Sequence, residues 1–319
     1  MVISRPIRLL LALLVTALAA WALWALPVER MAASLAAAQL PWIGAAVLAH
    51  LLIQPVAATQ WGLLLGTTTP PLTWRTLRRV FSLTSVANNT ANSLVGHAAG
   101  TTMLARLPGV GATRALSLLV LDQLCVGVAK ITVLLVAMAS LGAVSSGALP
   151  SWLRTGLLAL VIPVVLLLFA TIVAPRGLAP WLSRLPVVGA RVHSWLEIVA
   201  AVPPRRVLAA VGCALLVKGC EAGGIAAVQL AFDVPVTVHT VALALAATAV
   251  ATLIPVMPAN LGSYEGSVYV ALTLAGISPP LALTVALAQH ATQLLAAILP
   301  GVLVAWQRSL VSQSPPHRE

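Results

Sequence analysis

Long apolar runs alternate with short polar and basic segments along almost the whole chain. Most of these runs approach or exceed the roughly 20 residues that a helix needs to cross a bilayer. The runs predict helices at residues 7–26, 41–65, 115–141, 155–173, 207–231, 241–256 and 281–306. We therefore expect an all-α fold, a polytopic integral membrane helical bundle of about seven to eight spans.

One segment, residues 80–104, departs from the apolar pattern. Its amide, imidazole and glycine positions are Asn88, Asn89, Asn92, Gly96, His97 and Gly100, among several serines and threonines. A helix of this polarity cannot face lipid on all sides. It is either a broken or re-entrant segment that lines a wet cavity, or a buried helix whose polar side chains hold it to its neighbours.

The composition bears on the class of protein, and the distribution of charge bears on which loops face the cytoplasm. Hydrophobic residues make up 60% of the chain and charged residues 8%, against roughly 25% charged residues in soluble domains, so we expect no soluble domain of any size. The formal net charge is +11. Since the arginines lie between apolar runs, they indicate cytoplasmic loops and contacts with anionic lipid headgroups rather than nucleic-acid binding.

Two basic segments are expected on the cytoplasmic side. The first contains Arg75, Arg78 and Arg79, and the second is the loop of residues 175–206. An even number of crossings must separate two points on one side, yet three candidate helices lie between them. The polar segment at residues 80–104 is therefore predicted to enter the membrane and turn back.

Two other segments bear on topology. Arg5 and Arg8 precede the first apolar run, which we interpret as an uncleaved helix with its N-terminus in the cytoplasm. The loop of residues 175–206 mixes Trp181 and Trp195 with arginines. This composition suits an amphipathic segment on the cytoplasmic face, and a solvated basic loop is the alternative.

The polar segment has a counterpart near the C-terminus. The first copy contains Gly96, Gly100 and Gly109, then a long helix with Asp122 and Gln123. The second contains Gly262, Gly266 and Gly276, then a long helix with Gln289 and His290. The spacing from the glycine turn to the polar pair is the same in both copies. We expect one transmembrane domain over residues 1–319, with a first repeat at about 41–141 and a second at about 207–306.

Coincidence is the alternative to a repeat, because glycine is frequent in membrane helices. Counting crossings places both broken segments on the cytoplasmic side. An inverted repeat would require opposite sides, so the sequence leaves the symmetry open.

Ionisable residues inside the apolar runs are costly and mark candidate functional positions. Lys218 and Glu221 are three residues apart and are expected to form an intramembrane ion pair, either functional or only fixing helix packing. Asp122 and Lys130 lie on roughly one helix face. Glu265 is the sharpest candidate, because Pro255, Pro258, Asn260 and Gly262 precede it and predict irregular backbone.

The stretch from Pro255 to Glu265 resembles the proline–glycine–glutamate signature of the lysylphosphatidylglycerol synthase transmembrane region, a family also described as flippase-like. The resemblance covers about residues 41–306. In the first half it includes Asn92, Gly100, Leu104, Gly109, Arg114, Ala115 and Asp122. The chain ends soon after its last apolar run, so the resemblance implies the flippase-like half without the aminoacyl-transferring domain.

The chain departs from the family pattern at three places. The family often has Gly-Gly where this chain has Ala259-Asn260, and an acidic–arginine pair where it has Asp122-Gln123. It also often has an arginine near the position of Gln289-His290. If those arginines grip a lipid phosphate, this chain must use other groups.

These features together favour a translocator of a lipid or lipid-linked intermediate, without enzymatic activity or a cofactor. The expected polar cavity for an anionic headgroup is lined by Asn88, Asn89, Asn92, His97, Glu265 and His290, with Asp122 and Gln289 nearby. Arg106 and Arg114 would attract phosphate at its cytoplasmic mouth. No catalytic or metal-binding motif is recognisable. A membrane-embedded enzyme acting on a lipid carrier and a small-solute secondary transporter are the alternatives.

The expected partners are membrane lipids, especially anionic ones, and lipid-biosynthesis enzymes. The alanine- and arginine-rich composition suggests a bacterial inner membrane as the location. The direction of transport, the coupling ion and the oligomeric state are not specified by the sequence.

Overall fold

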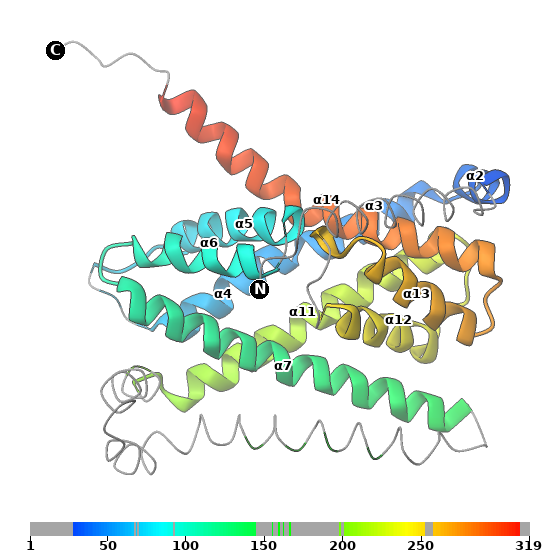
Figure 1. The fold of residues 1–319 in the computed structure, drawn as a ribbon, viewed down its shortest axis with the longest axis horizontal. Coiled ribbons are helices and arrows are strands. Elements are labelled where there is room, and N and C mark those ends of the chain that lie inside the picture. The colour runs from blue at the N-terminus through cyan, green and yellow to red at the C-terminus, as the bar shows by residue number, and fades with distance from the viewer. Residues whose placement is uncertain are drawn as a thin grey trace, which may run out of the picture.

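The computed structural model describes residues 28–66, 68, 70–91, 93–144, 155, 159, 162, 166, 198, 201–252 and 258–312. All secondary structure in these residues is helical (Figure 1). The predicted helix at residues 7–26, almost all of the one at 155–173 and most of the loop at 175–206 lie outside the described residues.

Four helical stretches are long and apolar enough to cross a membrane. They are α3 with α4 (Leu40–Leu51 and Ile53–Leu65), α7 (Gly111–Val144), α11 (Pro204–Ala231) and α14 (Pro279–Ser312). At about 1.5 Å per residue, the 28 residues of α11 extend for about 42 Å, more than the roughly 30 Å of a hydrocarbon core. These stretches confirm the helices predicted at residues 41–65, 115–141, 207–231 and 281–306. A short helix, α2 (Val28–Ala36), precedes them.

The polar segment forms a hairpin of two helices. α5 (Trp74–Thr90) ends at Ala91, where the backbone leaves the helical conformation, and α6 (Ser93–Ala105) returns beside it. Gly96 of α6 lies against Asn88 of α5, and Gly100 lies against Thr84. Because these facing positions run in opposite directions, the helices are antiparallel, and both ends of the hairpin emerge at the same end of the bundle.

A second hairpin follows α11. α12 (Val238–Ala251) packs beside α13 (Ser263–Leu274), and a short 3-10 turn, η2 (Pro258–Asn260), precedes α13. α12 has 14 residues and extends for only about 21 Å, so it is too short to cross a bilayer. The sequence interpretation of residues 241–256 as a spanning helix was therefore wrong.

The two hairpins open toward opposite ends of the bundle (Figure 1). One buried core surrounds the first hairpin and includes Leu65 of α4, Leu118 of α7 and Ala210 of α11. The other surrounds the second hairpin and includes Ala46 of α3, Val228 of α11 and Val285 of α14. The sequence argument had placed both broken segments on one side, whereas in the structure the two hairpins open at opposite ends of the bundle.

The first spans of the two halves connect these ends. Gln39, just before α3, donates its backbone N–H to the carbonyl of Ala231 at the end of α11 at 2.9 Å. At the other end, Gly66 after α4 lies beside the guanidinium of Arg206 near the start of α11. α3 and α4 together therefore run antiparallel to α11.

Candidate functional site

A polar cavity of about 200 Å³ lies between α4, α5, α6, α7 and α11. Its polar lining residues are Gln60, Thr84, Ser85, Asn88, His97, Asp122, Gln123, Lys218 and Glu221, and Trp61 and Phe81 contribute aromatic rings. Five candidates named from the sequence (Asn88, His97, Asp122, Lys218 and Glu221) thus come together, from four different helices.

The carboxylate of Asp122 joins α7 to α4 at this cavity. Its Oδ1 accepts hydrogen bonds from Nε2 of Gln60 at 2.8 Å and from the indole Nε1 of Trp61 at 3.0 Å. Its Oδ2 accepts a bond from Nε2 of Gln123 at 3.1 Å. The side chain is buried, so these bonds replace the hydration that a carboxylate loses inside a protein.

Lys218 and Glu221 form the expected ion pair on α11. Nζ of Lys218 lies 2.5 Å from Oε2 of Glu221, and the side chains are 12% and 18% exposed. Lys218 also borders a second hollow of about 640 Å³, mostly apolar, between α7, α11 and α12. The ion pair therefore stands between a polar cavity and an apolar groove.

The asparagines of the first hairpin have different surroundings. Asn88 borders the cavity, and its buried Oδ1 has no hydrogen-bond partner among the described residues. Asn89 instead donates its Nδ2 to the backbone carbonyl of Ser85 at 2.9 Å. Asn92 lies outside the described residues. A buried acceptor beside a hollow is available to water or to a ligand.

Glu265 and His290 belong to a separate polar network between α13 and α14. Oε1 of Glu265 lies 2.8 Å from Nδ1 of His290, whose ring stacks on Tyr264 with centroids 4.2 Å apart. Nε2 of Gln289 donates to the hydroxyl of Tyr264 at 2.8 Å. Glu265, Gln289 and His290 are not among the residues that line the polar cavity, so the structure divides the single cavity expected from sequence into two groups.

Neutral amides and an indole that the sequence reasoning passed over are central to this region. Gln60 and Trp61 hold Asp122, as described above. Gln54 of α4 donates to Oγ of Ser85 at 3.1 Å and to the carbonyl of Ala297 at 3.3 Å, while its Oε1 accepts from Ser82. It therefore links α4, α5 and α14. In the sequence, Gln54, Gln60 and Trp61 are marked only by an uncharged polar group within an apolar run, which is less conspicuous than a charge.

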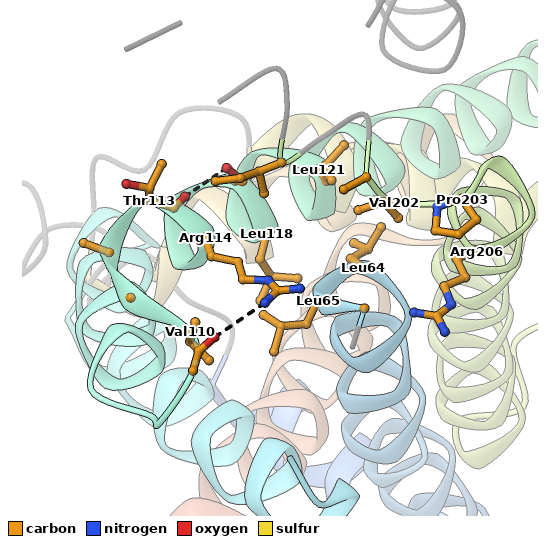
Figure 2. A pocket seen from close by; sticks show the side chains of 17 residues that line it. Leu64, Leu65, Val110, Thr113, Arg114, Leu118, Leu121, Val202, Pro203 and Arg206 are labelled. Atoms are coloured by element: carbon orange, nitrogen blue, oxygen red, sulfur yellow. Dashed lines mark hydrogen bonds between the residues drawn. The ribbon is translucent and has the colours of Figure 1, made fainter. Parts of the chain in front are cut away.

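A basic pocket of about 600 Å³ lies at the end of the bundle where the first hairpin opens (Figure 2). It is bordered by the end of α4, the start of α7 and the residues leading into α11. Arg114 and Arg206 both reach it. Arg106 is exposed and does not line this pocket.

The glycine turns before the two long helices share one backbone conformation. Gly109 has φ +75° and Gly276 has φ +86°, in the left-handed region where a Cβ is unfavourable. Gly262 also has a positive φ and caps α13. Gly266 is exposed within α13, and Pro258 opens η2. Pro255 lies outside the described residues.

Four helical stretches long and apolar enough to cross a membrane define a polytopic α-helical integral membrane protein. The chain belongs to the family of the lysylphosphatidylglycerol synthase transmembrane region, whose family model matches residues 7–301. Neither a curated protein nor a solved structure shows a significant match to the chain. The family match agrees with the resemblance noted in the sequence over about residues 41–306 and extends it toward the N-terminus, to residue 7.

One departure from the family pattern has a backbone consequence. Ala259 has φ +54° and Asn260 has φ +56°, a region that glycine enters without penalty. A Gly-Gly pair suits these two positions, whereas alanine there carries strain of roughly 1–2 kcal/mol.

Proposed function

We propose that this protein translocates a lipid or a lipid-linked intermediate between the two leaflets. The headgroup would pass through the polar cavity while the acyl chains stay in the bilayer. The main support is the convergence of Asp122, Lys218 and Glu221, which come from the long apolar helices α7 and α11, on one hollow. Each ionisable residue costs about 2.5–3.5 kcal/mol at the centre of a membrane helix and typically lines a substrate or ion path.

The size of the cavity favours a headgroup over a whole lipid. Its volume of about 200 Å³ is below the roughly 300–1,000 Å³ of pockets that enclose drug-sized ligands. The apolar groove on the other side of Lys218 offers a surface for hydrocarbon. A lipid whose headgroup lies in the polar cavity and whose acyl chains lie against the apolar groove would match the walls of both.

The arrangement of the helices is also consistent with transport. In each half, a long span precedes a hairpin and a second long span follows it. We interpret the halves as an inverted repeat, with the two hairpins as re-entrant segments, a plan that places sites near mid-membrane in many transporters. We place the end with Arg75, Arg78 and Arg79 in the cytoplasm, in a bacterial inner membrane.

Reconstitution tests this function directly. Purified protein would be placed in liposomes that contain a fluorescent anionic phospholipid or an isoprenoid-phosphate analogue, and exchange between leaflets would be followed by quenching from outside. The test variant is Lys218→Met with Glu221→Gln, which removes both charges and leaves neither one unpaired. Loss of charge-assisted hydrogen bonds worth about 1.5–3 kcal/mol should slow exchange roughly tenfold or more.

Lys130→Met is the matched control. Lys130 is also an intramembrane lysine, but its Nζ donates to Oγ1 of Thr252 at 2.9 Å and it does not line the polar cavity. This variant should exchange lipid at close to the wild-type rate. No exchange of any lipid by the wild-type protein, or equal slowing in both variants, would contradict the proposed function.

Measurements on the same liposomes distinguish translocation from the two alternative functions. An enzyme acting on a lipid carrier would change the mass of the recovered lipid, which mass spectrometry would detect. A small-solute transporter would leave lipid exchange at the rate of empty liposomes while releasing a trapped solute. Translocation predicts unchanged lipid masses and faster exchange.

A further inference from the structure

Glu265 and His290 are ionisable residues inside the bundle that the proposed headgroup path through the polar cavity does not use. His290 lies near the middle of the candidate span Pro279–Gln307, and Glu265 lies at the closed end of the second hairpin. Their side chains are 12% (Glu265) and 4% (His290) exposed. A buried ionisable pair inside a membrane helix bundle typically belongs to an ion or proton path.

The contact between the two side chains determines which histidine nitrogen can take up a proton. Oε1 of Glu265 lies 2.8 Å from Nδ1 of His290, so Nδ1 carries the proton of this hydrogen bond when Glu265 is ionised. Oε2 of Glu265 accepts the backbone N–H of Gly262 at 2.7 Å. Nε2 of His290 has no hydrogen-bond partner among the described residues, and it is therefore the nitrogen that can gain or lose a proton.

A proton bound at Nε2 removes the net negative charge of the pair. Without it, a neutral imidazole donates its Nδ1–H to the carboxylate. With it, an imidazolium faces the same carboxylate through the same hydrogen bond, and no isolated charge is left in the apolar interior. The contact is kept in both states, and histidine is the side chain that most readily exchanges a proton at physiological pH.

Tyr264 holds the imidazole of His290 in position. The two rings stack with centroids 4.2 Å apart and an interplanar angle of 14°. The hydroxyl of Tyr264 accepts a hydrogen bond from Nε2 of Gln289 at 2.8 Å, and both residues are buried. Because an aromatic face attracts a cation, this packing orients the imidazole and also accommodates its protonated form.

Other ionisable groups near the pair come from the helices that pack against α13 and α14. Those described in the half of the bundle around the second hairpin are Glu29 of α2, His50 of α3, Lys218, Cys220 and Glu221 of α11, and His239 of α12. None of them is hydrogen-bonded to the pair, and the arginines of α5 lie at its start, toward the other end. Glu221 interacts electrostatically with Tyr264 and also borders the polar cavity, so it links the charge of the cavity to that of the pair.

The helix that carries His290 also packs along a wall of the polar cavity. About three turns beyond His290, a Cβ at Gly301 would lie 2.5 Å from the backbone carbonyl oxygen of Ser82 on α5. Gln54 joins Oγ of Ser85, which lines the cavity, to a backbone carbonyl of α14. A change at the junction between α13 and α14 can therefore act on α5 through α14.

We propose that the Glu265–His290 pair is a proton-binding site and that its proton is the coupling ion for the lipid movement proposed above. A proton from water adds to the lone pair of Nε2 and later returns from it to water, and no other bond changes. In the proton-bound pair both partners of the hydrogen bond are charged, which strengthens the junction of α13 with α14. Uptake and release thus bias the position of α14 against α5. The coupling rests on the proposed translocation, whereas the proton site does not.

Nitrogen NMR on the wild-type chain tests the site itself. Protein labelled with nitrogen-15 in its histidines would be titrated in detergent from pH 5 to pH 9. The signals of His290 would be assigned through their contacts with the ring of Tyr264, one of two tyrosines in the chain. Nε2 should change from a bare to a protonated nitrogen while Nδ1 stays protonated throughout. An Nε2 that keeps one state over the whole range, or an Nδ1 that loses its proton, would overturn the site.

A pH gradient across liposomes tests the coupling. The liposomes would contain the fluorescent anionic phospholipid and a difference of one pH unit, with potassium and valinomycin holding the membrane potential at zero. One pH unit is a tenfold difference in proton activity, so coupling to one proton allows up to about a tenfold difference in lipid between the leaflets. We expect at least a threefold asymmetry with the wild-type protein, and none with a protonophore or in protein-free liposomes.

The wild-type result separates the coupling from translocation. Fast exchange that ends with equal leaflets despite the gradient would overturn the coupling and leave translocation standing. No exchange of any lipid would end both the translocation and the coupling proposals, and the NMR titration would still decide whether the pair binds a proton.

Glu265→Gln is the test variant and His239→Gln is its matched control. The amide keeps the size of the side chain but has no charge to balance an imidazolium, so exchange should continue and end with equal leaflets. His239 is a histidine of the same hairpin whose Nδ1 lies 3.5 Å from Oγ of Ser140, and its replacement should leave the asymmetry intact.

Three outcomes with these variants would overturn the coupling. They are wild-type asymmetry in Glu265→Gln, loss of asymmetry in both variants, and loss of exchange itself in a Glu265→Gln protein that keeps the wild-type thermal midpoint. If Glu265→Gln does not fold, the NMR titration and the gradient experiment on the wild-type protein decide the proposal without it.

Discussion

The carboxylate of Glu265 makes two contacts at once. Oε2 accepts the backbone N–H of Gly262 at 2.7 Å, at the start of α13, and Oε1 lies 2.8 Å from Nδ1 of His290 on α14. A single side chain therefore caps one helix and joins it to the next. Its surroundings are largely buried, which makes each contact stronger than at a surface.

A double-mutant cycle should show that Glu265 and His290 act as a unit. Glu265→Gln and His290→Ala should each lower the free energy of unfolding in detergent. Because both break the same charged hydrogen bond, the double variant should lose less than the sum, with a coupling of about 1.5–3 kcal/mol. Denaturant-induced unfolding of the four proteins measures this coupling.

An independent pair provides the control for this cycle. Gln60 belongs to the Asp122 network and shares no hydrogen-bond partner with Glu265 among the described residues. Gln60→Leu combined with Glu265→Gln should be additive to within about 0.5 kcal/mol. A coupling below that value between Glu265 and His290 would mean that their contact does not contribute in solution.

Charged side chains are rare in apolar runs, and this rarity explains which site residues could be predicted from the sequence. Charged side chains such as Asp122, Lys218 and Glu221 are conspicuous in apolar runs, and the structure places them around one cavity. Gln54 and Gln60 carry no charge and are inconspicuous in the sequence. In the structure, Gln54 donates two hydrogen bonds, and Gln60 donates one to the carboxylate of Asp122. The assignment of partners depends on packing between distant helices, which sequence spacing does not contain.

At the scale of elements, the glycine pairs of the two hairpins differ in their surroundings. A Cβ at Gly96 would lie 2.6 Å from the backbone nitrogen of Asn88, besides contacting its side chain, so α5 and α6 would have to separate. A Cβ at Gly266 would meet nothing within 4 Å. The sequence predicted equivalent small-residue elements, but only the first pair packs against a neighbouring helix in this way.

Alanine substitution should therefore have opposite effects at these positions. Gly96→Ala should destabilise the protein by about 1–3 kcal/mol through overpacking. Gly266→Ala should be neutral or stabilising by up to about 1 kcal/mol, because alanine has the higher helix propensity. Thermal unfolding in detergent compares the two, and a loss of stability in Gly266→Ala equal to that in Gly96→Ala would contradict the difference in packing.

Helix length decided how well the elements could be predicted. The four long runs that the structure describes were identified correctly because each is long enough to cross a bilayer. The 14 residues of α12 lie in a run that looked long enough only when the residues after Ala251 were counted with it. The hairpin of α5 and α6 was anticipated from its polarity, whereas the turn at Ala91 has no strong local signal.

For the whole molecule, the opposite openings of the hairpins predict opposite accessibility. In a background with Cys125, Cys213 and Cys220 replaced by alanine, Ala112→Cys would mark the end where the first hairpin opens. Ser278→Cys would mark the other end. A membrane-impermeant maleimide should label Ser278→Cys in intact cells and Ala112→Cys only after permeabilisation, since the arginine-rich end is expected in the cytoplasm.

Two further cysteine positions provide a second marker at each end of the bundle for this labelling test. Arg75→Cys should behave like Ala112→Cys, and Val236→Cys should behave like Ser278→Cys, because each pair lies at one end of the bundle. Labelling of Ala112→Cys and Ser278→Cys from the same side would contradict the arrangement of the hairpins. It would restore the topology obtained by counting crossings in the sequence.

The error in that count has a simple physical origin. Counting crossings treats each apolar run as one full passage, so a single half-length helix reverses the side of everything that follows. The two basic clusters used in that count lie before Val207. Arg308 and Arg318, which follow the last apolar run, are the positive residues of the second half that bear on its side, and the count did not use them.

The short turn η2 has a mechanical consequence. It belongs to the second hairpin, yet it packs against α5 of the first, so the two hairpins touch even though they open toward opposite ends of the bundle. A tilt of α5 that widens the polar cavity must either pull η2 with it or break this contact. The three residues of η2 therefore link the two ends of the bundle for as long as this contact is kept.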